Sequence, residues 1–329
     1  DHLISVTVHR FLSILRLFAL HAEALGDGFR MYSPPVGAIE TLLDKARLHE
    51  QCHRLGIGTP RSWFPESEGD VAAVAGEAPF PLLIKQRSQV LSTKSKGEMV
   101  ARAEDLEARF ARFVDKNPHG DAMVARWPEA CRPMLQEYHP EVLGGTLLVS
   151  GFMDRSGRLL AIRASRKILQ QPRRLGIALC LEESSLDPAV AEKLCLLCRS
   201  VGFYGIFHVE LIPSEGQLLL IDFNPRYFHH LAFEIARGMP LPLFAHLAAL
   251  GDEHRLTQLA CEARTSDRPG GRVFTQRFGL GIRVGGQRLT GRMTGEDARR
   301  WWRWYRENRP RMVDAAADPH DRLPEIVDA

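Results

Sequence analysis

The sequence predicts a mixed α/β fold, because apolar strands and amphipathic helices follow one another along its 329 residues. The clearest strands are two short apolar runs, 207–211 and 220–224, on either side of a Pro-Ser-Glu-Gly turn. A helix over 187–201, with Asp187 at its start, leads directly into this pair. Hydrophobic residues make up 45% of the chain and charged residues 25%, which is ordinary for a globular protein, and the length favours roughly two or three domains.

Proline and glycine separate the helices and strands predicted for the first half of the chain. They are, in order, a strand over 3–8, a helix to Leu25, a strand over 29–32, a helix over 39–55, a strand over 79–85, a helix over 103–114 and a strand over 134–138. Gly56 and Gly58 end the second helix. The strand over 79–85 delivers Lys85 at its end, ahead of a polar loop over 86–97.

The second half begins with a predicted hairpin, strands 146–153 and 159–164, that turns at 154–157. After the helix and strand pair described above come a helix from 242 to 250, a polar connector to Gly271, strands over 272–283 and a last helix over 296–307. Thr294 and Asp297 occupy capping-box positions of the last helix. Its apolar stripe is predicted to consist of Ala298, Trp301, Trp302 and Tyr305, with the arginines mostly elsewhere.

Polar side chains interrupt the strands 207–211 and 220–224 where valine or isoleucine would be expected. Alternation puts His208 and Glu210 on one face of the first strand, and Asp222 and Asn224 on one face of the second, with Arg226 just beyond. Buried acids are costly unless a cation or a partner compensates them. Three oxygen ligands followed by a guanidinium indicate magnesium and phosphate. The alternative is a structural ion pair in which Arg226 neutralises Asp222.

The turn between these strands determines whether the acids meet. A two-residue loop that pairs Pro213 with Gly216 would separate the acids. A three-residue loop ending at Gly216 would pair Pro213 with Gln217, with Gly216 in the left-handed region. We expect the second arrangement, in which Glu210 and Asp222 are diagonal neighbours roughly 7–8 Å apart at the backbone.

Charge and cysteine content argue against several classes of protein. A formal net charge of +3 is too small to require a polyanionic partner. The partly apolar stretch 11–25 contains charged residues and is too short to span a bilayer. Of the six cysteines, only Cys195 and Cys198 have metal-like spacing, and they lie in a predicted helix without a second pair. We therefore expect no nucleic acid, no membrane, no zinc, and a location in the reducing cytoplasm.

Several separate segments now fit one kind of site. Lys45 opens a helix, Lys85 ends a strand, the loop 88–97 offers hydroxyls and backbone amides to phosphate, and the acid-bearing strands come last. In this order the sequence resembles the ATP-grasp superfamily of carboxylate–amine ligases and carbamoyl-phosphate synthase large chains. The matching segments are Asp44-Lys45, GIGTP at 56–60, FPLLIK at 80–85, LQEY at 135–138, HVEL at 208–211 and IDFNPR at 221–226.

The resemblance implies a nucleotide site. Lys45 and Lys85 would hold the phosphates of ATP, together with Ser92 of the polar loop. The adenine and ribose would be bound by Gln136, Glu137, Tyr138 and Glu141.

The resemblance also implies a metal site and a group of catalytic cations. Mg²⁺, or Mn²⁺ in its place, would be held by Glu210, Asp222 and Asn224. Arg226 would stabilise the transferred phosphoryl group, and Arg166 and Lys167 would lie near the substrate or the γ-phosphate.

The implied fold is the ATP-grasp fold, two α+β lobes that clamp ATP. The expected divisions are a partial amino-terminal α/β subdomain over 1–40, a small lobe over 41–135, a large lobe with the metal site over 136–250, and a carboxyl-terminal extension over 251–329 that packs on the large lobe. The implied reaction joins a carboxylate to an amino-acid-like amine through an acylphosphate and forms ADP. A homodimer is expected by resemblance only.

Three departures from the family keep an alternative open. Asp222 stands where a glutamate is more usual, the loop 88–97 has few glycines, and only one or two strands are predicted before Asp44. These departures motivate a regulatory module that binds ATP without ligation. A third hypothesis, an adaptor for nucleic acid or membranes that uses the arginines of the helix 296–307, is disfavoured by the small net charge.

Overall fold

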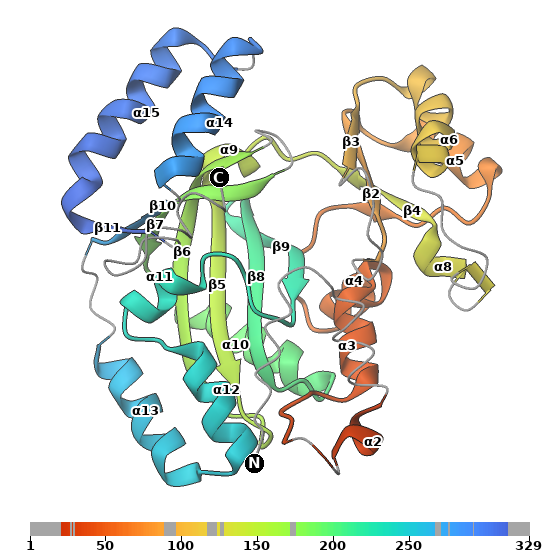
Figure 1. The fold of residues 1–329 in the computed structure, drawn as a ribbon. Coiled ribbons are helices and arrows are strands. Elements are labelled where there is room, and N and C mark those ends of the chain that lie inside the picture. The colour runs from red at the N-terminus through yellow and green to blue at the C-terminus, as the bar shows by residue number, and fades with distance from the viewer. Residues whose placement is uncertain are drawn as a thin grey trace.

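The computed structural model describes residues 21–26, 28, 30–88, 97–116, 124–125, 128–171, 176–266, 271–275, 277–291 and 293–314. Within them two separate sheets form, one with the strand order β1-β4-β2-β3 and one with the order β11-β10-β7-β6-β5-β8-β9 (Figure 1). The mixed α/β prediction is confirmed. The predicted strand 3–8, most of the helix before Leu25, and Ser92 lie outside the described residues.

The smaller sheet is antiparallel and carries its own core. It consists of β1 (Ser62–Trp63), β2 (Leu82–Gln86), β3 (Gly97–Val100) and β4 (Pro133–Glu137). Helices α5 (Glu68–Glu77) and α6 (Leu106–Lys116) pack on it. Their shared core contains Val71, Ile84, Phe113 and Leu135. The segment 138–145, with the short helix α9 (Val142–Gly145), leads from β4 to the larger sheet.

The larger sheet begins with a long antiparallel meander. Its strands are β5 (Thr146–Met153), β6 (Leu159–Gln171), β7 (Ile177–Ser184), β8 (Gly205–Ser214), β9 (Gln217–Asn224), β10 (Val273–Thr275) and β11 (Met312–Val313). The neighbours β10 and β11 are parallel, and all other pairs are antiparallel. The last two strands therefore extend the sheet beyond β7, on the side away from β9.

Helices cover both faces of the larger sheet. Val149 and Val209 pack with α3 (Val36–Leu43), α4 (Lys45–Arg54) and α10 (Pro188–Ser200). Phe152 and Ile206, of opposite parity in their strands, pack on the other face with α12 (Leu241–Leu250) and α13 (Glu253–Thr265). The short helix α11 (Leu231–Ala236) lies on this second face, where its Phe233 is fully buried beside Leu148.

The single helix predicted over 39–55 is two helices that meet at Asp44. The backbone of Asp44 is extended, with φ −85° and ψ 116°, and its carboxylate accepts hydrogen bonds from the amides of Ala46 and Arg47. This is an N-cap, which provides partners for amides at the start of α4 that otherwise have none. Lys45 is consequently the first residue of a new helix.

Two further elements differ from the expectation. Residues 253–265, predicted as a polar connector, form α13, because Asp252 caps the amide of Arg255 and because Leu256, Ala260 and Ala263 bury one face. Only 273–275 of the predicted strands over 272–283 form a strand, and 277–289 is the helix α14. The described residues 30–32 of the predicted strand 29–32 are not in a strand.

The last helix, α15 (Gly295–Asn308), packs against α14, and the pair projects from the larger sheet (Figure 1). The hydroxyl of Thr294 accepts a hydrogen bond from the amide of Asp297 at 3.0 Å, as the capping prediction requires. The predicted stripe is wrong at one position. Trp304 packs into the cluster with Trp301, whereas Trp302 is 40% exposed.

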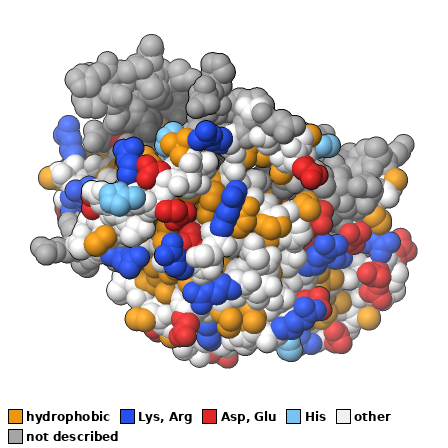
Figure 2. Space-filling view, turned by 90° about the horizontal axis from the view of Figure 1, so that it is seen from below, with side chains coloured by type: hydrophobic (Ala, Val, Ile, Leu, Met, Phe, Trp, Pro, Cys, Tyr) orange, Lys and Arg blue, Asp and Glu red, His pale blue; other side chains and the backbone are white. Residues whose placement is uncertain are grey.

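The longest described helix has 14 residues, and side chains of both charges lie on the face seen in Figure 2. None of the described helices is both long and apolar enough to cross a bilayer. On the face seen in Figure 2, acidic and basic side chains are interspersed with apolar ones. Charges of both signs lie near one another on this face, so their fields partly cancel there.

The surroundings of Gly151 and Gly37 predict opposite effects on stability when each glycine is replaced by alanine. A Cβ on Gly151 in β5 would lie 2.5 Å from Cζ of Phe207 and 2.7 Å from the carbonyl oxygen of Ala161. A Cβ on Gly37 in α3 would meet nothing within 4 Å. We expect Gly151→Ala to lower the free energy of unfolding by about 1–3 kcal/mol through overpacking. Gly37→Ala should raise it by about 0.5–1 kcal/mol. Urea denaturation measures both, and equal effects would contradict the described packing.

Candidate functional site

The β8–β9 hairpin turns through two residues, Glu215 and Gly216. Both have positive φ, 48° and 80°, and Ser214 pairs with Gln217. A two-residue loop with both residues in this region suits the twist of a hairpin. The predicted three-residue loop is therefore wrong, although Gly216 does lie in the left-handed region as expected.

A bulge in β9 brings the two acids opposite each other. Leu211 pairs with Leu220, but the next residue of β8, Glu210, pairs with Asp222, so that Ile221 is an extra residue. In an unbroken ladder Asp222 would share the face of Leu220, which belongs to the core. The bulge places Asp222 on the face of Glu210 instead.

The same shift sorts the residues that follow Asp222. Phe223 pairs with Val209 in the core, and Asn224 pairs with His208 on the polar face. The polar faces of the two strands coincide, as the favoured register required, although the loop and the pairs differ from that register. The acids are direct neighbours and not the diagonal neighbours that the sequence led us to expect.

Each acid forms an ion pair with a lysine from another element. Nζ of Lys45, at the start of α4, lies 2.7 Å from Oδ1 of Asp222 at the edge strand β9. Nζ of Lys167, in β6, lies 2.7 Å from Oε2 of Glu210. Lys167 reaches Glu210 across β5, where Thr146 pairs with Lys167 and Leu148 pairs with Glu210. The exposed fractions of the two lysine side chains are only 11% and 3%.

A third lysine comes from the smaller sheet. Nζ of Lys85 in β2 donates to Oε1 of Gln136 in β4 at 3.2 Å. Burial is the main cause that lowers the pKa of Lys85 to about 8, and Lys45 lowers it further, while Asp222 and Glu210 act in the opposite direction. Lys85 therefore lies within electrostatic range of both acids of the larger sheet.

The lysines keep both acids ionised. Burial would raise the pKa of Asp222, but the ammonium of Lys45, with a smaller effect of Lys85, lowers it to about 2. Burial would also raise the pKa of Glu210, and Lys167 holds it below its usual range. Both groups are carboxylates at neutral pH and can bind cations.

Asn224 and Arg226 continue the polar row. Nδ2 of Asn224 donates to Oδ2 of Asp222 at 3.1 Å, and Nη2 of Arg226 donates to Oδ1 of Asn224 at 3.1 Å. Nη1 of Arg226 donates to the carbonyl oxygen of Tyr227 at 2.9 Å. The guanidinium is thus fixed at the end of the row Asp222–Asn224–Arg226.

The donor set fits a magnesium ion that is shared with phosphates. Within the described ranges, no group of three or more His, Cys, Asp and Glu side chains could hold a metal by itself. The two facing carboxylates and the amide oxygen of Asn224 form the smaller set with which Mg²⁺ is usually held beside a nucleotide. The ammonium groups of Lys45 and Lys167 lie 2.7 Å from the carboxylates of Asp222 and Glu210. The two carboxylates therefore already bind positively charged groups in this structure.

The other predicted nucleotide ligands lie at the junction of the two sheets. Gln136 and Glu137 end β4, and Gln136 is buried with Nε2 donating to Oγ of Ser62 at 3.1 Å. Tyr138 and Glu141 belong to the segment 138–145 between the sheets. Tyr138 is partly buried, and Glu141 is 46% exposed at its side chain.

Arg166 is the predicted site residue that the structure does not bring to the cluster. It neighbours Lys167 in β6, so it projects to the opposite face of the sheet. It is 56% exposed at its side chain and pairs with Glu182 at 3.1 Å.

Two buried histidines, His208 and His230, lie beside the acids. The rings of His208 and His230 lie 4.9 Å apart, and Phe228 contacts both. Burial lowers the pKa of His208 to about 4 and that of His230 well below its ordinary value, so both are neutral. The alternation in β8 predicts the place of His208, but no periodicity indicates that His230 returns to it.

Known proteins resemble this chain over most of its length. No protein-family profile matches it. A carbamoyl phosphate synthase arginine-specific large chain from Oryza sativa subsp. japonica is 24% identical over 283 residues, which is 84% of this chain and 23% of the relative. A D-alanine–D-alanine ligase from Ectopseudomonas mendocina is 26% identical over 188 residues, 55% of each chain. The chain thus spans between 23% and 55% of the length of these relatives.

Solved structures agree on the fold. The biotin carboxylase domain of the Hydrogenobacter thermophilus 2-oxoglutarate carboxylase, solved with MgADP and bicarbonate, matches with a TM-score of 0.58 at 20% identity. The match covers 73% of this chain and 52% of that domain. The chain has the ATP-grasp fold.

The lowered pKa of Lys85 predicts a stability cost at neutral pH. Because the folded pKa of about 8 is below the ordinary 10.5, the ionised lysine destabilises the folded state below about pH 8, and this cost disappears as the pH rises towards 10.5. We expect Lys85→Met to raise the free energy of unfolding at neutral pH by about 1 kcal/mol, after loss of the hydrogen bond to Gln136. Urea unfolding at about pH 7 and about pH 10 checks this. A stability difference that does not shrink at the higher pH contradicts it.

Proposed function

We propose that the chain is the ATP-binding and catalytic part of an ADP-forming ligase that joins a carboxylate to an amine. The observation that carries this proposal is a pair of facing carboxylates on the larger sheet, each of which forms an ion pair with Lys45 or Lys167. Lys85 of the smaller sheet lies within electrostatic range of both. Such a site suits the triphosphate of ATP with its magnesium ion. The similarity to ATP-grasp ligases supports the same reading.

The proposed reaction has two steps. An oxygen of the substrate carboxylate attacks the γ-phosphorus of ATP, the bond to the β-phosphate oxygen breaks, and ADP leaves with an acylphosphate formed. The amine then attacks the acyl carbon, the bond to the phosphate oxygen breaks, and phosphate leaves while the nitrogen loses a proton. Both steps depend on positioning and on neutralisation of negative charge more than on a side-chain nucleophile.

The side chains divide this work. Lys45 and Lys85 bind the phosphates and give up their present partners, Asp222 and Gln136, to do so. Glu210, Asp222 and Asn224 would hold Mg²⁺, which when bound neutralises phosphate charge. Lys167 and Arg226 stabilise the transferred phosphoryl group from two sides of the row. Gln136, Glu137, Tyr138 and Glu141 hold the adenosine, and Ser92 belongs to the phosphate loop.

The partners we propose are small molecules. The substrates are a carboxylate and an amino-acid-like amine, and we infer two lobes that clamp ATP between them. The cysteines at the described positions are free thiols, which fits a reducing compartment such as the cytoplasm. A homodimer is proposed on the likeness to a biotin carboxylase domain that was solved as a dimer.

Removal of one metal carboxylate should abolish the reaction. We expect Glu210→Gln to lower substrate-stimulated ADP release by about 100-fold or more, because one charge of the magnesium site is lost. The readout is ADP release over a panel of amino acids and small carboxylates with Mg²⁺, with mass detection of the product. An unchanged circular dichroism spectrum shows that the variant is folded. Unchanged turnover would refute the assignment, and ATP binding without ADP formation by the unaltered chain would favour the regulatory module.

Two neighbouring residues of β6 give a sharper comparison. Lys167 contacts Glu210, whereas Arg166 is on the other face with Glu182. We expect Lys167→Met to reduce ADP release by about 100-fold and Arg166→Gln to leave it within about twofold. The same screen measures both, and the reverse order would mean that the face assignment of β6 in the site is wrong.

A further inference from the structure

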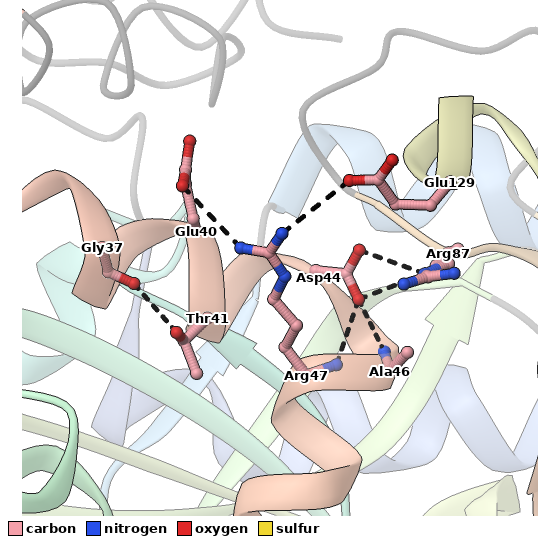
Figure 3. Close-up of polar contacts among 8 residues, drawn as sticks. All are labelled: Gly37, Glu40, Thr41, Asp44, Ala46, Arg47, Arg87 and Glu129. Carbon is pink, nitrogen blue, oxygen red and sulfur yellow. Dashed lines mark hydrogen bonds and ion pairs between the residues drawn. The ribbon is translucent and has the colours of Figure 1, made fainter. Parts of the chain in front are cut away.

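Asp44 forms more contacts than a helix cap requires. Its Oδ1 accepts from the amides of Ala46 at 2.9 Å and Arg47 at 3.1 Å (Figure 3). Nε of Arg87 lies 3.2 Å from the same oxygen and 3.1 Å from Oδ2. The side chains of Asp44 and Arg87 are only 10% and 12% exposed. This is a largely buried ion pair whose carboxylate also begins a helix.

The backbone joins the same two segments. The amide of Lys45 donates to the carbonyl oxygen of Arg87 at 3.0 Å, and Asp44 forms a bridge with Ser88. Lys45 directly follows Asp44, and Lys85 lies two residues before Arg87. The contact therefore joins the two chain segments that carry the lysines to which we assign the phosphates.

The contact also joins the two sheets. Helices α3 and α4 pack on the larger sheet through Ala38, Leu42 and Leu48, and α3 contacts β9. Arg87 follows β2 of the smaller sheet. A second, more exposed contact joins the same parts, since the guanidinium of Arg47 lies 3.8 Å from Glu129 in α8 (Pro128–Cys131), just before β4 (Figure 3). The same guanidinium lies 3.8 Å from Glu40 in α3. The ion pair is thus a link between the sheets that is separate from the segment 138–145.

Two positively charged lysines, Lys45 and Lys85, lie in the segments that this ion pair joins. After burial, Lys45 is the largest cause that lowers the pKa of Lys85, which means that the two ammonium groups repel each other. Lys45 is on the helix that Asp44 caps, and Lys85 is on the strand that Arg87 follows. An ion pair that fixes both elements keeps the two lysines close in spite of their repulsion, until a bound phosphate neutralises their charges.

We propose that Asp44 and Arg87 are positioning residues, a latch that sets the separation of Lys45 and Lys85 and so the affinity for the nucleotide phosphates. The inference rests on the proposed function and assigns residues that do not themselves touch the nucleotide. Loss of the latch lets the lysines move apart. Phosphate affinity falls as a result, while the carboxylate and amine substrates bind as before.

The test is binding of the non-hydrolysable ATP analogue AMP-PNP with Mg²⁺ by calorimetry. We expect Arg87→Gln to weaken binding by about 10-fold, and Arg87→Lys to recover part of the loss because the charge is kept. The double variant Asp44→Asn/Arg87→Gln leaves no buried charge without a partner and keeps a capping side chain, so it tests the latch even if Arg87→Gln is unstable. The matched control is Arg109→Gln, which breaks an ion pair with Glu98 at 2.8 Å elsewhere in the smaller lobe and should not change binding.

A double-mutant cycle with Lys45→Met separates positioning from general structure. If Arg87 acts through Lys45, Arg87→Gln weakens AMP-PNP binding much less in the Lys45→Met background than in the unaltered chain. Equal losses in both backgrounds, or an unchanged affinity in Arg87→Gln, would overturn the latch while the nucleotide site stands. Failure of the unaltered chain to bind AMP-PNP would overturn the proposed function and the latch with it.

Discussion

One extra residue in an edge strand decides which side chains can act together in this protein. Because Ile221 is inserted into β9, Leu220 and Phe223 both stay in the core although they are an odd number of positions apart. Asp222 is released to the opposite face, beside Glu210. The same two strands therefore carry a continuous apolar face and a polar face with both acids. In a hairpin without a bulge, either Asp222 would lie on the apolar face or Phe223 would leave the core.

The polar row is balanced by charges from distant parts of the chain. Lys45 comes from a helix start, Lys85 from the smaller sheet and Lys167 from β6, and each is held where burial disfavours its charge or an acid neutralises it. The folded state thus bears an electrostatic cost at the place where a polyanion would bind. Such a cost is typical of functional sites, since residues chosen only for stability would be apolar here.

Local patterns in the sequence predicted most elements and the polar faces of β8 and β9, because alternation and turn residues act over short distances. They did not predict the pairing of Glu210 with Asp222, since a bulge has no reliable signature of its own. Arg166 and Lys167 could not be separated either, because the register of β6 in the sheet decides which of them faces the acids. The predicted helix 39–55 ran through Asp44, although Lys45 was also expected to open a helix. The break follows from the extended backbone of Asp44 and from its capping bonds, and its ion pair with Arg87 became visible only in the structure.

The order of the strands at the far side of the larger sheet has a consequence for shorter versions of the chain. β10 pairs with the outer side of β7 and follows α13 in the chain, and β11 pairs with β10 and follows the α14–α15 pair. A version that stopped at Thr265 would leave the backbone amides and carbonyls along one side of β7 without their neighbours. Such an uncovered border recruits strands from other molecules, so we expect that shorter version to aggregate even though every residue of the polar row is present.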